Sequence, residues 1–314
     1  MAFGPETTTT EVLDGVDLSD KTAVVTGASA GLGVETVRSL ASVGAHVVMA
    51  VRDPDKGRDA AAAIKNAVPE ASLELGTVDL ASLDSVRAFA AWLLERHESI
   101  DLLINNAGVM ACPLGRTAED FEMHLGTNHL GHFVLTTEVA PALLAAAPAR
   151  VVNLSSRGHQ RSDIDWDDPH YRERPYDKWN AYGQSKTANC LFSVEFDRRF
   201  GGRGVHAYAV HPGVIATELA RYLTREDLED LASRSPSGAP MQFKPVEAGA
   251  ATTVWAATSP DLAEVGGVYL EDCHVSTEVT EPGSPGGHAA WALDPASAKR
   301  LWEWSEEEVG ATPA

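Results

Sequence analysis

Basic residues are scarce in this sequence. Its 314 residues include 25 lysines and arginines against 45 aspartates and glutamates, which gives a formal net charge of −20 at pH 7. A surface of that sign repels the phosphates of nucleic acids and of anionic membranes. The composition therefore argues against nucleic-acid binding and indicates a solvated acidic surface.

Cysteines and long apolar runs are also few. Cys112, Cys190 and Cys273 are widely spaced and odd in number, so they match neither a disulfide framework nor a zinc motif. No apolar run is long enough to span a bilayer. Residues 1–10 lack the basic and apolar regions of a secretory signal. These absences predict a cytoplasmic protein without a membrane span.

The chain alternates β-branched runs with helical segments, the pattern of a parallel sheet with crossover helices. The expected strands are 22–26, 46–51, 73–78, 101–104, 150–154, 205–210 and 267–270, and the expected helices include 34–43, 56–68, 83–95, 126–146 and 296–309. Hydrophobic residues make up 44% of the chain, and no linker divides it. We therefore predict a single α/β domain with a doubly wound, seven-stranded parallel Rossmann sheet and helices on both faces.

The predicted catalytic domain covers residues 20–310. Residues 1–19 form a polar extension that we expect to be loosely ordered, and residues 311–314 form a tail. Two long stretches interrupt the strand and helix pattern: an insertion at 162–179, rich in aromatic and charged residues, and a mixed, charged flap at 218–245.

A glycine-rich loop, Gly27-x-x-x-Gly31-x-Gly33, lies between the first strand and its helix. In that position, backbone N–H groups and the positive end of the helix can hold a pyrophosphate. The spacing departs from the common Gly-x-Gly-x-x-Gly form, so an ordinary tight turn is the alternative. The position after a strand favours the dinucleotide interpretation.

The end of the second strand distinguishes between cofactors. An acidic residue there would bind a free ribose 2′-hydroxyl, but Val51 is followed by Arg52. An arginine can pair with a 2′-phosphate, so the sequence predicts a preference for NADP(H). Asp53 is close enough that NAD(H) also remains a candidate, and Arg52 could instead pair with Asp53 or Asp55 on the surface.

Tyr182 and Lys186 are four residues apart in a helical segment. One turn of helix separates them, so the phenol and the ammonium share a face. A buried cation favours the phenolate and would lower the pKa of the tyrosine toward neutrality. The pair therefore predicts a general acid and base.

Several motifs follow one another along the chain: Thr26-Gly27-x-x-x-Gly31-x-Gly33, Asn105-Asn106-Ala107-Gly108, Asn128, Val152-Asn153-Leu154-Ser155-Ser156, Tyr182-x-x-x-Lys186 and His211-Pro212-Gly213. Over residues from about 20 to 310 the chain resembles the short-chain dehydrogenase/reductase superfamily. Within it, the chain is similar to the retinol dehydrogenase-like and protochlorophyllide reductase-like branch. Any one motif could arise by chance, but the ordered set is specific.

The resemblance implies a catalytic set. Tyr182 would exchange a proton with the substrate oxygen, and Lys186 would lower the pKa of Tyr182 and hold the ribose hydroxyls. Ser156, rather than Ser155, would orient the reacting oxygen, and Asn128 would anchor a water molecule that relays protons. The 25 residues between Ser156 and Tyr182 are about twice the commonest gap, although this branch carries a similar insertion.

The resemblance also implies a set of cofactor-binding residues. Those expected at the pyrophosphate are Gly27, Ser29, Gly31, Leu32 and Gly33; Arg52 would meet the 2′-phosphate; Asp79 and Leu80 would meet adenine; Asn105, Ala107 and Gly108 would line the adenosine ribose side; Pro212, Gly213, Ile215 and Thr217 would meet the nicotinamide, with Tyr182 and Lys186 at its ribose. For Asn105, a structural role at a strand end is the alternative.

The predicted function is an NADP(H)-dependent oxidoreductase that interconverts an alcohol with its ketone or aldehyde and needs no metal. His124, His129 and His132 share one expected helix, but no carboxylate or cysteine completes a metal set. A small apolar substrate is expected from the aromatic insertion, Met241 and Phe243, although such aromatic residues could also only pin the loops.

Two other functions remain open. The chain could be a catalytically silent NADP(H)-sensing regulator, although such proteins typically lack the tyrosine or the lysine. It could be an epimerase or dehydratase, which usually has a larger carboxyl-terminal domain.

The resemblance also implies association into a homodimer or homotetramer, through the helices that carry Asn128 and Tyr182, unless the carboxyl terminus covers them.

Overall fold

The computed structural model describes residues 3–227, 243–280 and 284–310. Its main sheet has the strand order β3-β2-β1-β4-β5-β6-β7-β8. The strands are β1 Thr22–Thr26, β2 His46–Val51, β3 Ser72–Thr77, β4 Leu102–Asn105, β5 Ala149–Leu154, β6 Val205–His211, β7 Val268–Glu271 and β8 His274–Val275. All neighbouring pairs are parallel except β7 and β8. The doubly wound α/β prediction is therefore confirmed.

The predicted number of strands was wrong, because the main sheet has eight strands instead of seven. The additional strand, β8, pairs antiparallel with β7 across a tight turn at Asp272 and Cys273, both of which have positive φ angles. Its two residues are exposed, so the sequence carries no run of buried side chains to predict it. A separate pair of short strands, β9 Glu278–Val279 and β10 His288–Ala289, lies outside this sheet.

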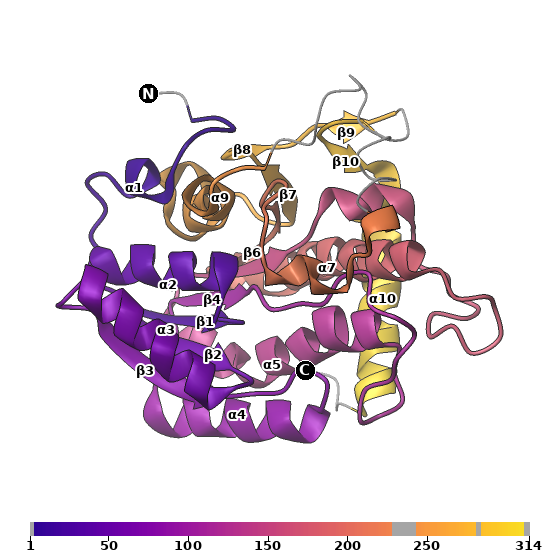
Figure 1. The fold of residues 1–314 in the computed structure, drawn as a ribbon, viewed down its shortest axis with the longest axis horizontal. Coiled ribbons are helices and arrows are strands. Elements are labelled where there is room, and N and C mark those ends of the chain that lie inside the picture. The colour runs from indigo at the N-terminus through magenta and orange to yellow at the C-terminus, as the bar shows by residue number, and fades with distance from the viewer. Residues whose placement is uncertain (1–2, 228–242, 281–283, 311–314) are drawn as a thin grey trace.

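Helices cover both faces of the sheet (Figure 1). One core contains residues of α1 Thr9–Val12, α2 Gly31–Ser42, α3 Pro54–Ala67 and α9 Val246–Thr258. The other contains residues of α4 Leu83–Arg96, α5 Gly131–Glu138, α6 Ala140–Ala145, α7 Lys178–Phe200 and α10 Pro295–Val309. Side chains alternate between the faces along a strand, so Val24 enters the second core and Val25 the first.

Part of the amino-terminal extension is folded, contrary to the expectation of loose order. Thr8 and Glu11 form a capping box at the start of α1. Val12 belongs to the core shared with α9, and the Thr9 hydroxyl donates to Glu35 of α2 over 2.5 Å. The polar composition of this extension gave no indication of the short helix α1, in which Thr9 and Val12 are buried.

The predicted helix 126–146 is divided into three pieces. A π-helical segment, η1 Leu125–Leu130, carries Asn128 and continues into α5, and α6 begins anew at Ala140. Pro141 lies in the first turn of α6, where a missing N–H is tolerated, whereas inside one continuous helix it would break the bonding.

The carboxyl-terminal helix α10 packs against α7 (Figure 1). Trp302 lies against Phe133 of α5 and Phe192 of α7, with ring centroids 5.1 and 5.8 Å apart. It thereby covers part of the α5 and α7 surface through which we expected copies to associate. Among the described helices, none is both long and apolar enough to cross a membrane.

The fold brings the predicted motifs to one edge of the sheet. The glycine loop follows β1, Arg52 follows β2, the Asn105 motif ends β4, the paired serines follow β5 and the His211 motif ends β6. In a parallel sheet all carboxyl ends meet at the same edge, where crossover folds bind their ligands.

Candidate active site

The glycine positions of the loop between β1 and α2 have no room for side chains. Gly27 and Gly31 have φ angles of +67° and +54°, which favour glycine. A Cβ at Gly33 would lie 2.3 Å from the carbonyl oxygen of Gly27, and one at Gly27 would lie 2.9 Å from Cα of Ala107. At these positions no side chain covers the backbone of the loop, so a ligand can approach it closely.

The helix that follows the loop leaves its first N–H groups without a side-chain cap. Its N-cap residue is Ala30, which makes no capping hydrogen bond. Free N–H groups and the positive end of the helix dipole form an anion site. Ser29 and Leu32 belong to the same turn, and these features fit the pyrophosphate of a dinucleotide.

Thr26 and Asn106 hold the loop against the end of β4. The Asn106 amide donates to the Thr26 carbonyl over 2.7 Å, and the N–H groups of Asn106 and Ala107 donate to the Thr26 hydroxyl over 2.9 and 3.0 Å. His132 shares that hydroxyl at 2.9 Å. Thr26 and Asn106 were predicted only as members of motifs, and their role in positioning the glycine loop was not predicted.

The substitution Gly33→Ala should weaken NADPH binding about tenfold or more, because the strain of overpacking is about 1–3 kcal/mol. The added Cβ would meet the Gly27 carbonyl oxygen at 2.3 Å and the Asn106 amide nitrogen at 2.8 Å. Fluorescence titration with NADPH measures the change. Gly202→Ala is the control, since nothing lies within 4 Å of a Cβ there, and equal affinities of the two variants would refute the cradle.

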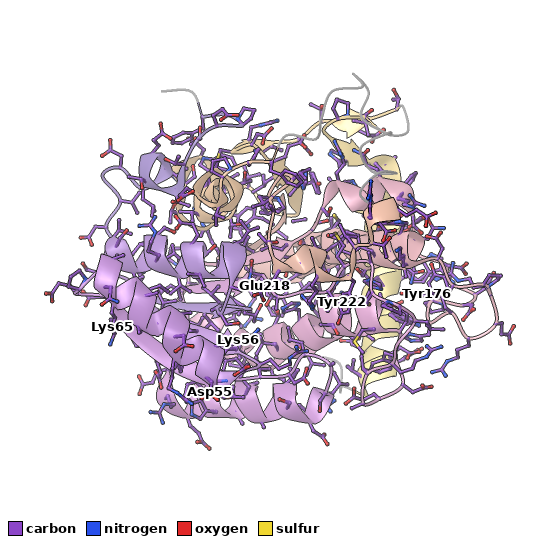
Figure 2. The ribbon with its side chains drawn as sticks, in the orientation of Figure 1. Asp55, Lys56, Lys65, Tyr176, Glu218 and Tyr222 are labelled. Carbon is purple, nitrogen blue, oxygen red and sulfur yellow. The ribbon has the colours of Figure 1, made fainter. Side chains whose placement is uncertain are left out.

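Arg52 is exposed at the end of β2 and makes no hydrogen bond or ion pair within the described ranges. Asp53 instead caps α3, accepting from the backbone of Asp55 and Lys56 over 3.0 and 3.3 Å, and Asp55 pairs with Arg58. Figure 2 shows Asp55 and Lys56 at the start of α3. The alternative of an arginine neutralised by Asp53 or Asp55 is therefore not observed.

The residues expected near adenosine are mainly engaged with the protein. One carboxylate oxygen of Asp79 accepts from the N–H of Ala81 over 3.0 Å, and Leu80 is buried against Gly131. The Asn105 amide donates to Thr136 and Asn153 over 2.9 and 2.8 Å. Its side chain lies in the core, so only the main chain of Asn105 remains for the predicted ribose contact.

The segment after β6 lies against the glycine loop. The side chain of Thr217 lies 3.2 Å from where a Cβ of Gly31 would stand, and Ile215 and Leu32 both pack against Gly249 of α9. Gly213 has a φ angle of +96° and follows Pro212 in the turn. The predicted nicotinamide segment and the pyrophosphate loop are thus neighbours, and Gly249 is a contact that the sequence did not indicate.

Tyr182 and Lys186 lie on α7, which begins at an Asp177 cap. The Lys186 ammonium lies 5.6 Å from the centroid of the Tyr182 ring and donates to the carbonyl oxygen of Leu154 over 2.8 Å. Both side chains are buried. The two residues therefore share a face of the helix, and the lysine is anchored to the end of β5.

The electrostatics of this pair differ from the sequence-based expectation of a lowered tyrosine pKa. Burial raises the pKa of Tyr182 to about 12, against an opposing hydrogen bond from Ser156. Burial also lowers the pKa of Lys186 to about 8. Both directions follow from the cost of placing a charge away from water. In the protein alone, Tyr182 is therefore a protonated phenol at neutral pH.

The paired serines have different surroundings. Ser155 is buried, donates to the Lys186 carbonyl over 2.9 Å and lies 3.1 Å from the Cys190 sulfur. Ser156 accepts from the N–H of Gly158 over 3.0 Å. A Cβ at Gly158 would lie 2.9 Å from the Tyr182 ring and 3.4 Å from the Ser156 oxygen, so Ser156 stands beside the tyrosine.

Asn128 connects the Asn105 motif to α7. Its amide donates to the Val109 carbonyl over 3.0 Å and to the Ser185 hydroxyl over 2.9 Å, and its side-chain oxygen accepts from the Val109 N–H over 2.8 Å. A Cβ at Gly108 would lie 3.0 Å from that oxygen and 3.8 Å from Nζ of Lys186. Asn128 thus fixes the chain that passes Lys186.

His124, which the sequence offered only as a histidine without a carboxylate partner, forms a buried pair with Glu122 beside Tyr182. Glu122 and His124 are fully buried and 2.8 Å apart, and the His124 ring meets the Tyr182 ring edge-on at 6.0 Å. The Tyr176 hydroxyl, 3.3 Å from His124, donates to the Cys112 carbonyl over 2.9 Å. Burial raises the pKa of Cys112 to about 11, which agrees with an inert thiol.

The aromatic residues of the insertion mainly fix it to the protein. Arg300 of α10 lies 4.3 Å from the ring centroid of Trp166, and Tyr171 is buried with Arg174 lying 3.6 Å from its ring centroid. In the flap, Met241 lies outside the described residues and Phe243 is 52% exposed. Tyr176, whose hydroxyl lies 3.3 Å from His124, is one aromatic residue of the insertion that lies beside the site.

The chain is similar to known proteins over most of its length. Residues 21–228 match the family model for short chain dehydrogenase. Human retinol dehydrogenase 12 is 42% identical over 297 residues, which are 94% of this chain and 88% of that protein. The short-chain dehydrogenase/reductase prx1 of Penicillium roqueforti is 39% identical over 294 residues, 92% and 85% of the two chains.

A solved structure shows the same fold with a cofactor. Pseudomonas aeruginosa RhlG, in an active-site complex with NADP, is 25% identical with a TM-score of 0.64, and the match covers 81% of this chain and 95% of RhlG.

Proposed function

The chain belongs to the short-chain dehydrogenase family and is therefore an oxidoreductase that uses a nicotinamide cofactor, and from this premise we propose that it interconverts an alcohol with its ketone or aldehyde using NADP(H). The observation that carries this proposal is the convergence of an uncapped glycine loop with Ser156, Tyr182 and Lys186 at one edge of the sheet.

The proposed mechanism assigns the proton to Tyr182. When bound, NADPH supplies the hydride. The raised pKa of Tyr182 keeps its hydroxyl protonated at neutral pH, the form that a general acid needs to protonate the oxygen of a carbonyl undergoing reduction. Ser156, beside the ring, would hold that oxygen. Lys186, with a pKa near 8, would hold the ribose hydroxyls and return a proton to the phenol.

Cofactor choice rests on Arg52, which has no partner within the described chain. The substitution Arg52→Gln should raise the ratio of KM for NADPH to KM for NADH about tenfold to a hundredfold, because a charge-assisted hydrogen bond contributes about 1.5–3 kcal/mol. Steady-state kinetics with both cofactors give the ratio. Arg58→Gln, which removes an arginine paired with Asp55, is the matched control. An equal ratio in both variants would argue against recognition of the 2′-phosphate by Arg52.

We propose an apolar carbonyl or alcohol as the substrate. The name of the human relative, retinol dehydrogenase 12, supports this class and makes retinal and retinol the first pair to assay. The test is a series of aldehydes and ketones of increasing apolar length, with NADPH absorbance as the signal. Rising kcat/KM with length supports the proposal, and tight NADPH binding without any turnover would instead favour a cofactor-sensing protein.

A further inference from the structure

Three potential metal ligands meet far from the glycine loop. His46 begins β2, Glu74 lies on β3, and His97 follows α4. The Glu74 oxygen Oε2 lies 3.5 Å from Nε2 of His46 and 3.2 Å from Nε2 of His97. One ligand atom from each residue falls within 4.8 Å of the other two.

The fold explains why these distant residues meet. His46 pairs with Ser72 in the β2 and β3 register, so the cluster lies at the amino-terminal edge of the sheet, opposite the cofactor loop. Along β3, Glu74 and Gly76 point to the same face, and Phe89 and Trp92 of α4 pack against Gly76. The end of α4 therefore places His97 beside Glu74.

The surroundings orient both imidazoles toward the carboxylate. Nδ1 of His46 lies 2.8 Å from the Ser72 hydroxyl, which fixes the ring and leaves Nε2 facing Glu74, as outer partners do for metal-binding histidines. Nε2 of His97 is buried and lacks a hydrogen-bond partner within the described residues, although Glu74 is near. A buried nitrogen without a hydrogen-bond partner is rare, and a bound metal ion would supply one.

Arg96 binds only one of the two carboxylate oxygens of Glu74. Arg96 donates to Oε1 of Glu74 over 2.6 Å and stacks near the Trp92 ring, so Oε2 remains between the two histidines. Two imidazole nitrogens and one carboxylate oxygen form the donor set of three-ligand Zn²⁺ sites, in which water completes the tetrahedron.

We propose that His46, Glu74 and His97 form a Zn²⁺ site that ties the edge strand β3 to β2 and α4. Tetrahedral coordination needs ligand atoms about 3.4 Å apart, and the distances from Oε2 of Glu74 to Nε2 of His46 and of His97 are 3.5 and 3.2 Å. The site is separate from the cofactor loop, because it lies at the opposite edge of the sheet.

The test is titration of the metal-stripped full-length protein with Zn²⁺ against a chromophoric chelator. We expect one ion per chain, a rise in Tm with added Zn²⁺ by mass action, and binding at least about tenfold weaker in His46→Gln, Glu74→Gln and His97→Gln. His274→Gln is the control, since that histidine is exposed and its nearest partner is a backbone carbonyl. NADPH affinity should be unchanged in all four variants, which also verifies that they fold.

A readout on the unmodified protein keeps the test independent of the variants. X-ray absorption of the zinc-loaded wild type should show a first shell of nitrogen and oxygen that contains two imidazoles. Binding of less than one ion per chain, a first shell without imidazole, or equal binding by the His274→Gln and His97→Gln variants would overturn the proposal.

Discussion

Replacing Tyr182 with phenylalanine should lower kcat for carbonyl reduction about 10²–10⁴-fold, the usual contribution of a positioned acid or base. The change removes the phenolic hydroxyl and retains the buried ring that meets His124. NADPH affinity should stay near that of the wild type, because the glycine loop is untouched. Stopped-flow kinetics and NADPH titration measure the two quantities separately.

The control for this prediction is Tyr208→Phe. Tyr208 is also buried, and its hydroxyl donates to the Leu262 carbonyl over 2.8 Å on the α9 side of the sheet. Its loss should cost about 1 kcal/mol of stability and leave kcat unchanged. Turnover by Tyr182→Phe equal to that of the Tyr208→Phe variant would refute the proton-transfer role of Tyr182.

The substitution Glu122→Ala should lower the free energy of unfolding by about 2–5 kcal/mol, because each buried hydrogen-bond donor left without an acceptor costs about 1–3 kcal/mol. Glu122 accepts from the His124 ring over 2.8 Å and from the backbone N–H groups of His124 and Leu125 over 3.0 and 2.8 Å. The alanine variant leaves the two backbone donors buried without this acceptor. Urea unfolding followed by circular dichroism gives the difference.

The control for the stability prediction is Glu303→Ala, which removes a carboxylate 57% exposed beside Lys299 and should change stability by less than about 1 kcal/mol. Burial alone would raise the pKa of Glu122, but hydrogen bonding to His124 outweighs burial and holds this pKa below its ordinary value. The contribution of Glu122 is therefore present at neutral pH and lost as the pH falls into the acid range. Equal losses of stability in the Glu122→Ala and Glu303→Ala variants would show that the pair of Glu122 and His124 does not stabilise the fold.

Sequence patterns predicted the strands best where β-branched runs are buried on both faces. Residues 22–26 and 46–51 were predicted with the observed bounds of β1 and β2, because such runs have few alternatives in a parallel sheet. The helix α9 gave no such signal. Its Ala- and Thr-rich residues are buried on nearly every side, so they show no amphipathic period.

The fold brings the predicted motifs to one edge of the sheet, but the chemistry expected of their residues depends on packing. The pKa of Tyr182 depends on burial, which spacing along a helix does not reveal, and the Asn105 side chain turned into the core because Thr136 and Asn153 offered partners. Clusters such as His46, Glu74 and His97 combine residues from three elements. The register of β2 and β3 and the packing of α4 on β3 bring them together.

The most direct measurement follows a deuterium label from C4 of the NADPH nicotinamide to an apolar aldehyde such as retinal. Mass spectrometry of the alcohol product should find one deuterium per molecule with the wild type, and product formation should be slowed about 10²–10⁴-fold in Tyr182→Phe. NADPH that binds tightly to the wild-type protein yet transfers no deuterium to any carbonyl in the series would contradict hydride transfer at this site.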